Sequence, residues 1–245
     1  MTKSKTPKVI LFIVEGESDE IILSDYLDLL FKTEEVVIDV QRGDILSDLD
    51  RNDNIKITLT DVIKAYMDKS KITAKDIFHI FQITDADGCY IDDSKIVVNT
   101  SLSTKTLYES KRISVISPQQ KTNIERRNKK KKKNINILST LNYVTANKIH
   151  LPYKIYYFST NLEHVTMNER NEDMNRKNSS AEDFIDNLTI SLEEFLWEYS
   201  EIKKENINSD SYKDSWNILK NEEKSLERLT NVPLLFELIK DTKFK

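Results

Sequence analysis

Short apolar runs separated by polar segments mark four stretches of the chain as β-strands. The runs are continuous rather than alternating, which is typical of strands covered on both faces. They are residues 8–14 (KVILFIV), 36–40 (VVIDV), 77–83 (IFHIFQI) and 153–158 (YKIYYF). Helical spacing of apolar residues lies between the first three runs, over 19–31 and 59–70, with Ser18 as predicted N-cap. This alternation predicts a parallel sheet with right-handed crossovers.

The second half of the chain has a mainly helical pattern. Residues 95–99 and 112–116 are short strands or loop, and 119–147 are predicted to be helical. The helices predicted after residue 180 are 181–203, 211–230 and 233–240, the last with Pro233 in its first turn. The expected fold is α/β, with a parallel-rich sheet flanked by helices over residues 1–170 and a helical C-terminal extension over 171–245.

Positive charge is concentrated in one segment. The 245 residues have a net charge of −4, but residues 126–133 (RRNKKKKK) carry seven positive charges, so the rest of the chain sums to −11. This distribution excludes a uniformly basic coat for nucleic acid. The residues predicted to contact nucleic-acid phosphates are Arg126, Arg127, Lys129, Lys130, Lys131, Lys132 and Lys133. The alternative is a solvated helix face.

Composition also bears on the compartment. No apolar run approaches the roughly 20 residues that a transmembrane helix needs, so we expect no membrane association. The basic start of the chain lacks a signal-peptide cleavage pattern. Cys89 is the single cysteine, which excludes an internal disulfide and a cysteine-based zinc site. We therefore expect a cytoplasmic protein.

The chain has only three glycines, and each lies at or near the end of a predicted strand. They are Gly16, Gly43 and Gly88. Glycine is favoured where the backbone needs a positive φ or where another group approaches closely. The glycines therefore point to one edge of the sheet.

Acidic residues follow three of the predicted strands. Glu15 with Asp19 follows the first, Asp85 with Asp87 follows the third, and Glu163 follows the last. Ligands of parallel α/β sheets bind at this edge, and several carboxylates converging there repel one another unless a cation is bound. Oxygen ligands without nearby histidine or cysteine suit Mg²⁺ or Mn²⁺. The alternative is that these acids are solvated turn residues or helix caps.

Two of these segments resemble a known family. Residues 13–19 (IVEGESD) and 85–88 (DADG), each after a strand, are similar to the two signature motifs of the toprim domain. Topoisomerases, bacterial primases, a ribosomal-RNA-maturing ribonuclease and the OLD-type nucleases of phage defence share this domain. The resemblance covers about residues 8–165, and residues 161–163 (NLE) are similar to a late acid of OLD-like and abortive-infection members.

The resemblance implies roles for the acids. Glu15 would act as general base or acid or as a metal ligand, and Asp85 and Asp87 would hold Mg²⁺ or Mn²⁺. Asp19 resembles an additional catalytic acid of the OLD-like branch. Glu163 would be a further metal ligand.

The resemblance also implies a function. It predicts a metal-dependent nuclease or nicking enzyme in phage defence, acting on DNA rather than RNA. The chain has no glycine-rich Walker loop, so any ATPase would be a separate partner. The alternatives are a non-catalytic toprim-fold module that binds nucleic acid or a partner ATPase, and an RNA-maturing ribonuclease. Homo-oligomer formation is left open.

Overall fold

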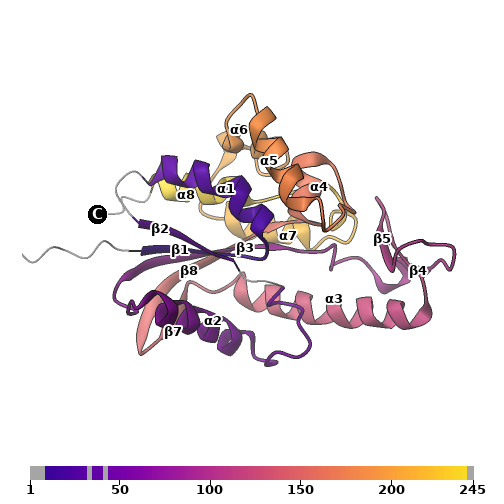
Figure 1. The fold of residues 1–245 in the computed structure, drawn as a ribbon, viewed down its shortest axis with the longest axis horizontal. Coiled ribbons are helices and arrows are strands. Elements are labelled where there is room, and N and C mark those ends of the chain that lie inside the picture. The colour runs from indigo at the N-terminus through magenta and orange to yellow at the C-terminus, as the bar shows by residue number, and fades with distance from the viewer. Residues whose placement is uncertain (1–8, 32–34, 41–43, 242–245) are drawn as a thin grey trace, which may run out of the picture.

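A five-stranded sheet forms the centre of the computed structural model, which describes residues 9–31, 35–40 and 44–241. The strand order is β2-β1-β3-β8-β7 (Figure 1). The strands are β1 (Val9–Val14), β2 (Glu35–Val40), β3 (Ile77–Asp85), β7 (Tyr143–Ala146) and β8 (Ile149–Phe158). Strand β1 pairs in parallel with both β2 and β3, and β3 pairs in parallel with β8. The predicted α/β class is confirmed at this level.

The edge strand β7 is a feature that the helical prediction for residues 119–147 missed. Helix α3 (Pro118–Leu138) ends earlier, and β7 pairs antiparallel with β8. The two strands are joined through Asn147 and Lys148, whose φ angles are 49° and 66°. Such a two-residue turn matches the twist of a hairpin, and asparagine tolerates the left-handed region. Pairing with β8 therefore replaces the predicted end of the helix.

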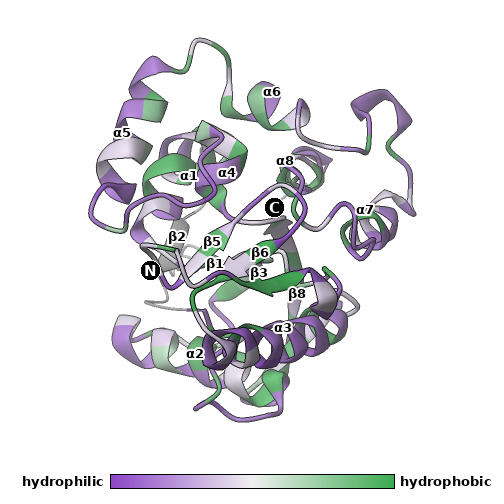
Figure 2. Ribbon diagram, turned by 90° about the vertical axis from the view of Figure 1, so that its right-hand side faces the viewer, coloured by the Kyte–Doolittle hydropathy of each residue, from purple (hydrophilic) through white to green (hydrophobic). Residues whose placement is uncertain are grey.

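Helices cover both faces of the sheet. Besides α3 they are α1 (Glu17–Leu30), α2 (Ile55–Ser70), α4 (Leu162–Met167), α5 (Lys177–Asn187), α6 (Leu192–Trp197), α7 (Ser211–Leu219) and α8 (Val232–Asp241), with short 3₁₀ turns at Asp93–Lys95 and Lys204–Asn206. Helices α2 and α3 lie on one face, and α1 and α8 lie on the other (Figure 1). Figure 2 shows the apolar β8 between these two layers.

The two layers explain why the first strand is continuously apolar. All six residues of β1 are buried, with Val9, Leu11 and Ile13 in one core and the alternate residues in the other. Successive side chains of a strand point to opposite faces. A strand between two helical layers therefore needs apolar residues at every position.

A second, smaller sheet lies beside α3 (Figure 1). Its strands are β4 (Ile96–Val98), β5 (Thr106–Tyr108) and β6 (Ile113–Val115), in the order β4-β6-β5. Of the two alternatives left open for residues 95–99 and 112–116, short strand or loop, both segments contain a short strand. Strand β5 had no clear sequence pattern.

The helical prediction for the C-terminal part is only partly correct. The predicted helix 181–203 is divided into α5 and α6, because Ser191 and Glu194 form a capping box that starts a new helix. The predicted helix 211–230 ends at Leu219. Helix α8 has Pro233 in its first turn, as predicted.

The chain after α7 returns to the sheet. The amide of Ser159 donates to the carbonyl of Leu229 at 2.9 Å, and Phe158 and Thr230 form an antiparallel bridge. Leu235 and Phe236 of α8 then pack in the same core as β1. The predicted division at residue 170 stays a prediction, although residues on both sides of it share this core.

One glycine meets both expectations for its type. Gly88 has a φ of 60°, and a Cβ atom there would lie 2.3 Å from Leu226 Cδ2. Gly16 instead has an extended backbone with a φ of −139°. Gly43 lies outside the described residues. Within the described part of the chain, no helix is long and apolar enough to cross a membrane.

Candidate active site

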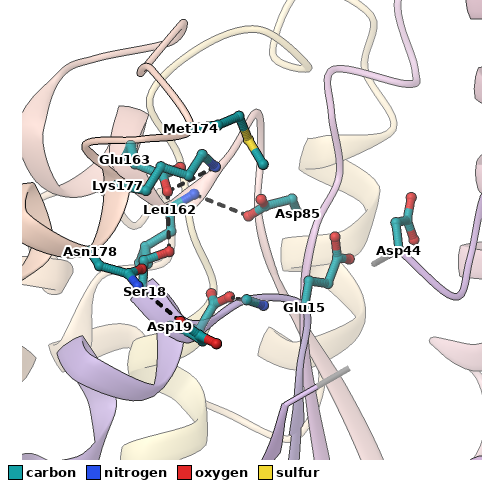
Figure 3. A pocket seen from close by; sticks show the side chains of 12 residues that line it. Glu15, Ser18, Asp19, Asp44, Asp85, Leu162, Glu163, Met174, Lys177 and Asn178 are labelled. Carbon is teal, nitrogen blue, oxygen red and sulfur yellow. Dashed lines mark hydrogen bonds and ion pairs between the residues drawn. The ribbon is translucent and has the colours of Figure 1, made fainter. Parts of the chain in front are cut away.

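A cavity of about 510 Å³ opens at the carboxyl ends of β1, β3 and β8 (Figure 3). Glu15 follows β1, Asp85 is the last residue of β3, and Glu163 lies shortly after β8. Because these three strands are neighbours in the sheet, their ends meet at one edge. The acids that line the cavity are Glu15, Glu17, Asp19, Asp44, Asp85 and Glu163. Four of the five predicted acids therefore line one cavity, together with Glu17 and Asp44, which were not predicted.

Glu15 is oriented by the neighbouring strand. The hydroxyl of Thr84, on β3, donates a hydrogen bond to Oε1 of Glu15. Burial raises the pKa of Glu15 above its ordinary value, and the nearby Lys131 ammonium opposes this only in part. Glu15 is thus a held carboxylate with an increased affinity for a proton.

Asp19 lies in the first turn of α1 and closes the turn after β1. Its Oδ2 accepts a hydrogen bond from the amide of Gly16 at 2.8 Å. Burial raises the pKa of Asp19 to about 7, with a contribution from Glu163 and an opposing one from the Gly16 amide. The predicted N-cap role of Ser18 is wrong, because α1 begins at Glu17 and Ser18 is buried within the turn.

Asp85 connects β3 to the start of α4. Its Oδ1 accepts a hydrogen bond from the amide of Leu162 at 3.0 Å. Burial raises the pKa of Asp85 well above its ordinary value, and Glu15 and Asp19 raise it further. The negative charge of Asp85 is therefore disfavoured in this arrangement unless a cation is close.

Glu163 has one satisfied and one unsatisfied oxygen. Its side chain is only 1% exposed. Oε1 accepts from the Ser18 hydroxyl at 3.2 Å and pairs with Lys177 Nζ at 2.9 Å. Oε2 is buried and has no hydrogen-bond partner. An unpaired buried carboxylate oxygen is energetically costly, so a cation or proton bound to Oε2 would stabilise this side chain.

Asp87 is directed to a different partner. It is not among the residues that line the cavity, and its Oδ2 lies 2.5 Å from Lys131 Nζ. Its φ is 52°, in the left-handed region next to Gly88. Burial would raise the pKa of Asp87, but Lys131 and Arg127 hold it below its ordinary value. Asp87 thus faces Lys131 rather than the cavity, although that lysine also contacts Glu15.

The basic run on α3 does not form one surface. Lys131 is fully buried, so it lies neither on a solvated helix face nor where it could contact nucleic-acid phosphates as predicted. It lies on the inner side of the helix, in step with Asn128, Ile135 and Leu138. The residues of the run that are exposed are Arg126, Lys129 and Lys133.

Other basic residues of the run donate hydrogen bonds to backbone carbonyls of neighbouring loops. Arg127 Nη2 donates to the carbonyl of Asp87 at 3.1 Å, and Lys130 Nζ donates to the carbonyl of Asp48 at 2.7 Å. Lys132 Nζ lies 3.4 Å from the carbonyl of Ile91. Through these contacts the basic side chains attach neighbouring loops to α3. Nucleic-acid binding by the run stays a prediction, and it rests most on the three exposed residues.

Sequence reasoning missed two residues that form ion pairs at the site. Asp44 accepts from the Leu46 amide at 2.7 Å and pairs with Lys131 at 2.8 Å. It follows β2, so the strand-end rule used for the other acids could have found it. Lys177 lies at the start of α5, and no pattern in the sequence connects that helix with the sheet edge.

The chemistry of the side chains at this site suits a hard divalent cation, but the side chains are not already arranged around an ion position. The acids offer only oxygen ligands, and the unpartnered Oε2 of Glu163 offers a free one. Across residues 9–31, 35–40 and 44–241, however, no three carboxylate, histidine or cysteine side chains are already grouped to hold an ion. The carboxylates would have to rotate toward a cation.

Comparisons with protein-family models, with curated proteins and with solved structures return no match. The toprim resemblance, carried by residues 13–19 and 85–88, therefore stays a prediction.

Proposed function

We propose that this protein is a Mg²⁺- or Mn²⁺-dependent nuclease or nicking enzyme of the toprim type. The observation that carries the proposal is the buried, unpartnered Oε2 of Glu163, a residue that lines the cavity together with further acids. Burial removes the water around this carboxylate oxygen, and the lost hydration energy is not compensated unless a cation or proton binds the oxygen.

The ligands in this proposal are Glu15, Asp85 and Glu163, with Asp87 contributing through its contact with Lys131. Burial is the main cause of the raised pKa values of Glu15 and Asp85, and neighbouring acids add to it, so a bound divalent ion would stabilise both carboxylates. When bound, such an ion would offset the negative charge that develops on a phosphodiester during cleavage.

In this proposal, carboxyl groups of the chain itself transfer the proton. Asp19 has a pKa of about 7, close to the value at which an acid or base works best at neutral pH. Its Oδ2 is held by the Gly16 amide, so Oδ1 is the atom that would exchange a proton. Glu15, turned by Thr84, is the second candidate for the general base or acid.

The proposed substrate is nucleic acid, DNA rather than RNA, and the proposed setting is phage defence with a separate ATPase as a partner. Arg126, Lys129 and Lys133 are exposed and would contact phosphates. This basic patch is the only strongly positive segment of an otherwise acidic chain.

A second candidate is a toprim-fold module that binds nucleic acid or an ATPase without turnover. It is favoured by Lys131 and Lys177, which already neutralise part of the acid cluster. It is also favoured by the lack of grouped metal ligands among the described residues.

Cleavage assays separate the two candidates. Supercoiled plasmid, linear duplex, single-stranded DNA and structured RNA are incubated with the protein and Mg²⁺ or Mn²⁺. We expect nicking or cleavage of DNA, reduced at least 100-fold in Glu163→Gln because a ligand and its charge are lost.

Glu20→Gln is the matched control, since Glu20 is an exposed acid that follows Asp19 on α1 and does not line the cavity, and it should cleave like wild type. Cleavage of RNA alone would assign the ribonuclease alternative. Binding of DNA without cleavage under all conditions would leave the docking module.

A further inference from the structure

Lys131 is a fully buried lysine in contact with three acids. Its Nζ lies 2.5 Å from Asp87 Oδ2, 2.8 Å from Asp44 Oδ2 and 3.9 Å from Glu15 Oε1. The acids come from three separate chain segments, after β3, after β2 and after β1. One ammonium group thus joins the ends of three parallel strands.

The contacts of Lys131 differ from those of its neighbours on α3. Lys130 and Lys132 donate to backbone carbonyls, and the acid that Lys130 also meets, Asp53 at 3.7 Å, is 93% exposed. Lys131 has no exposed surface, and the energetic cost of burying an ammonium group is met only if acids pair with it. Burial opposes the charge of the ammonium group, but the three surrounding acids raise the pKa of Lys131 above its ordinary value, so the group keeps its proton.

The same three acids would be a suitable ligand set for a divalent ion. The two shorter N–O distances exceed the roughly 2.1 Å of a Mg²⁺–oxygen bond by less than 1 Å. Small side-chain movements would therefore bring these oxygens into contact with an ion at the position of the ammonium nitrogen. Lys177 pairs with Glu163 on the other side of the cavity but is 26% exposed, so that side remains accessible.

We infer that Lys131 is a resident cation that occupies one half of the acid cluster, so that the native site takes one divalent ion and not two. Removal of the lysine charge would then create a second divalent site formed by Glu15, Asp44 and Asp87. The inference rests on the proposed function only for the position of the first ion, in the half that contains Asp85 and Glu163.

The test is the number of Mn²⁺ ions bound at equilibrium, measured by titration calorimetry and by electron paramagnetic resonance of free Mn²⁺. Lys131→Met should bind one ion more than wild type, whereas Lys131→Arg should bind the same number because it keeps the charge. Lys132→Met is the matched control on the same helix and should leave the number unchanged.

Stability supplies a second readout. Without metal, Lys131→Met should melt about 10 °C below wild type, because three acids lose their counter-charge. Millimolar Mn²⁺ should restore most of this loss, since the ion binds only the folded state. No such rescue is expected for a variant that has merely lost packing.

If Lys131→Met does not fold, Lys131→Met/Asp44→Asn keeps the net charge of the cluster. This double variant should fold without metal and still bind the extra ion through Glu15, Asp87 and the amide oxygen at position 44. An unchanged number of ions in the folded variants, with no Mn²⁺ rescue, would overturn the inference.

The outcome is separable from the proposed function. If wild type binds no ion and Lys131→Met binds one, the proposed metal-dependent activity fails while the role of Lys131 stands. If wild type and Lys131→Met each bind one ion, the metal site stands and the resident-cation role fails.

Discussion

The acids at this edge of the sheet outnumber the two lysines that pair with them, so their charges do not balance. Lys131 satisfies Asp87 and Asp44, and Lys177 pairs with Glu163. Asp85 has a backbone amide as its partner and retains a strongly raised pKa. The excess of negative charge makes the metal-free site a local source of instability.

Asp85→Asn should therefore stabilise the metal-free protein. The amide oxygen of asparagine can keep the hydrogen bond from Leu162, while the buried charge is removed. In EDTA at pH 7 we expect the free energy of unfolding to rise by about 1 kcal/mol, or roughly 3 °C in melting temperature. The same variant should lose any rise in melting temperature produced by Mn²⁺. Thermal melts with and without the ion measure both effects.

The free energy of unfolding of the metal-free protein should decrease as pH rises. Raised pKa values mean that native Asp85 and Asp19 keep protons that the unfolded chain releases above about pH 4, so unfolding free energy falls as pH rises. For Asp19 this fall extends to about pH 7. Asp85→Asn should flatten the curve, whereas Asp25→Asn, at an exposed site on α1, should not. A destabilised Asp85→Asn protein with an unchanged Mn²⁺ response would contradict the charge argument.

At the scale of elements, α3 performs two tasks on two faces. Its inner face carries Ile135, Leu138 and Lys131, which pack against the sheet and the acid loops. Its outer face presents Arg126, Lys129 and Lys133 to solvent. A helix places residues three and four apart on one side, so a single run of basic residues is divided between core and surface.

The outer face of α3 can be tested separately. Changing Arg126, Lys129 and Lys133 to Gln should lower the log–log salt slope of duplex binding by up to about 2.7, or 0.9 for each lost phosphate contact. Stability should be nearly unchanged, because all three side chains are exposed. Fluorescence anisotropy at several salt concentrations measures the slope.

The matched control changes Lys56, Lys64 and Lys69 to Gln on the neighbouring helix α2, where these lysines are also exposed. It removes the same charge from the same side of the sheet. An equal loss of slope in both variants would show a general charge effect and would exclude α3 as the specific contact.

At the scale of the whole molecule, the C-terminal residues complete the sheet's second layer. Leu196 of α6 and Leu235 and Phe236 of α8 are fully buried beside Ile10 and Phe12 of β1. The strand-like return at residues 229–231 also supplies hydrogen bonds to the end of β8. The layers of the fold are therefore built from both ends of the chain.

A fragment of residues 1–170 should consequently not fold on its own. The fragment would lack the residues of α5, α6 and α8 that complete this core, so part of the apolar surface beside β1 would be exposed, and such exposure opposes a stable native state. We expect no cooperative thermal transition by circular dichroism and strong binding of a hydrophobic dye, in contrast to the full chain. A cooperative transition in the fragment would instead support a separable C-terminal extension.

Local pattern was sufficient to predict the parallel strands and the position of the acids. A strand buried on both faces must be apolar at every residue, as β1 is, and Glu15 and Asp85 follow such strands directly. Because neighbouring parallel strands end at one edge, the meeting of these acids followed from strand order. Helix ends were less predictable, since β7 and the division between α5 and α6 depend on hairpin pairing and capping.

Tertiary structure alone decided how the charges are paired. Helical spacing from Ile135 and Leu138 puts Lys131 on the inner side of α3, but which acids it meets there follows from the packing of α3 against the sheet. The contact of Lys177 with Glu163 depends on where α5 lies after a long irregular segment. Ion pairs between segments far apart in the sequence depend on global packing, so their partners become known only when the chain is folded.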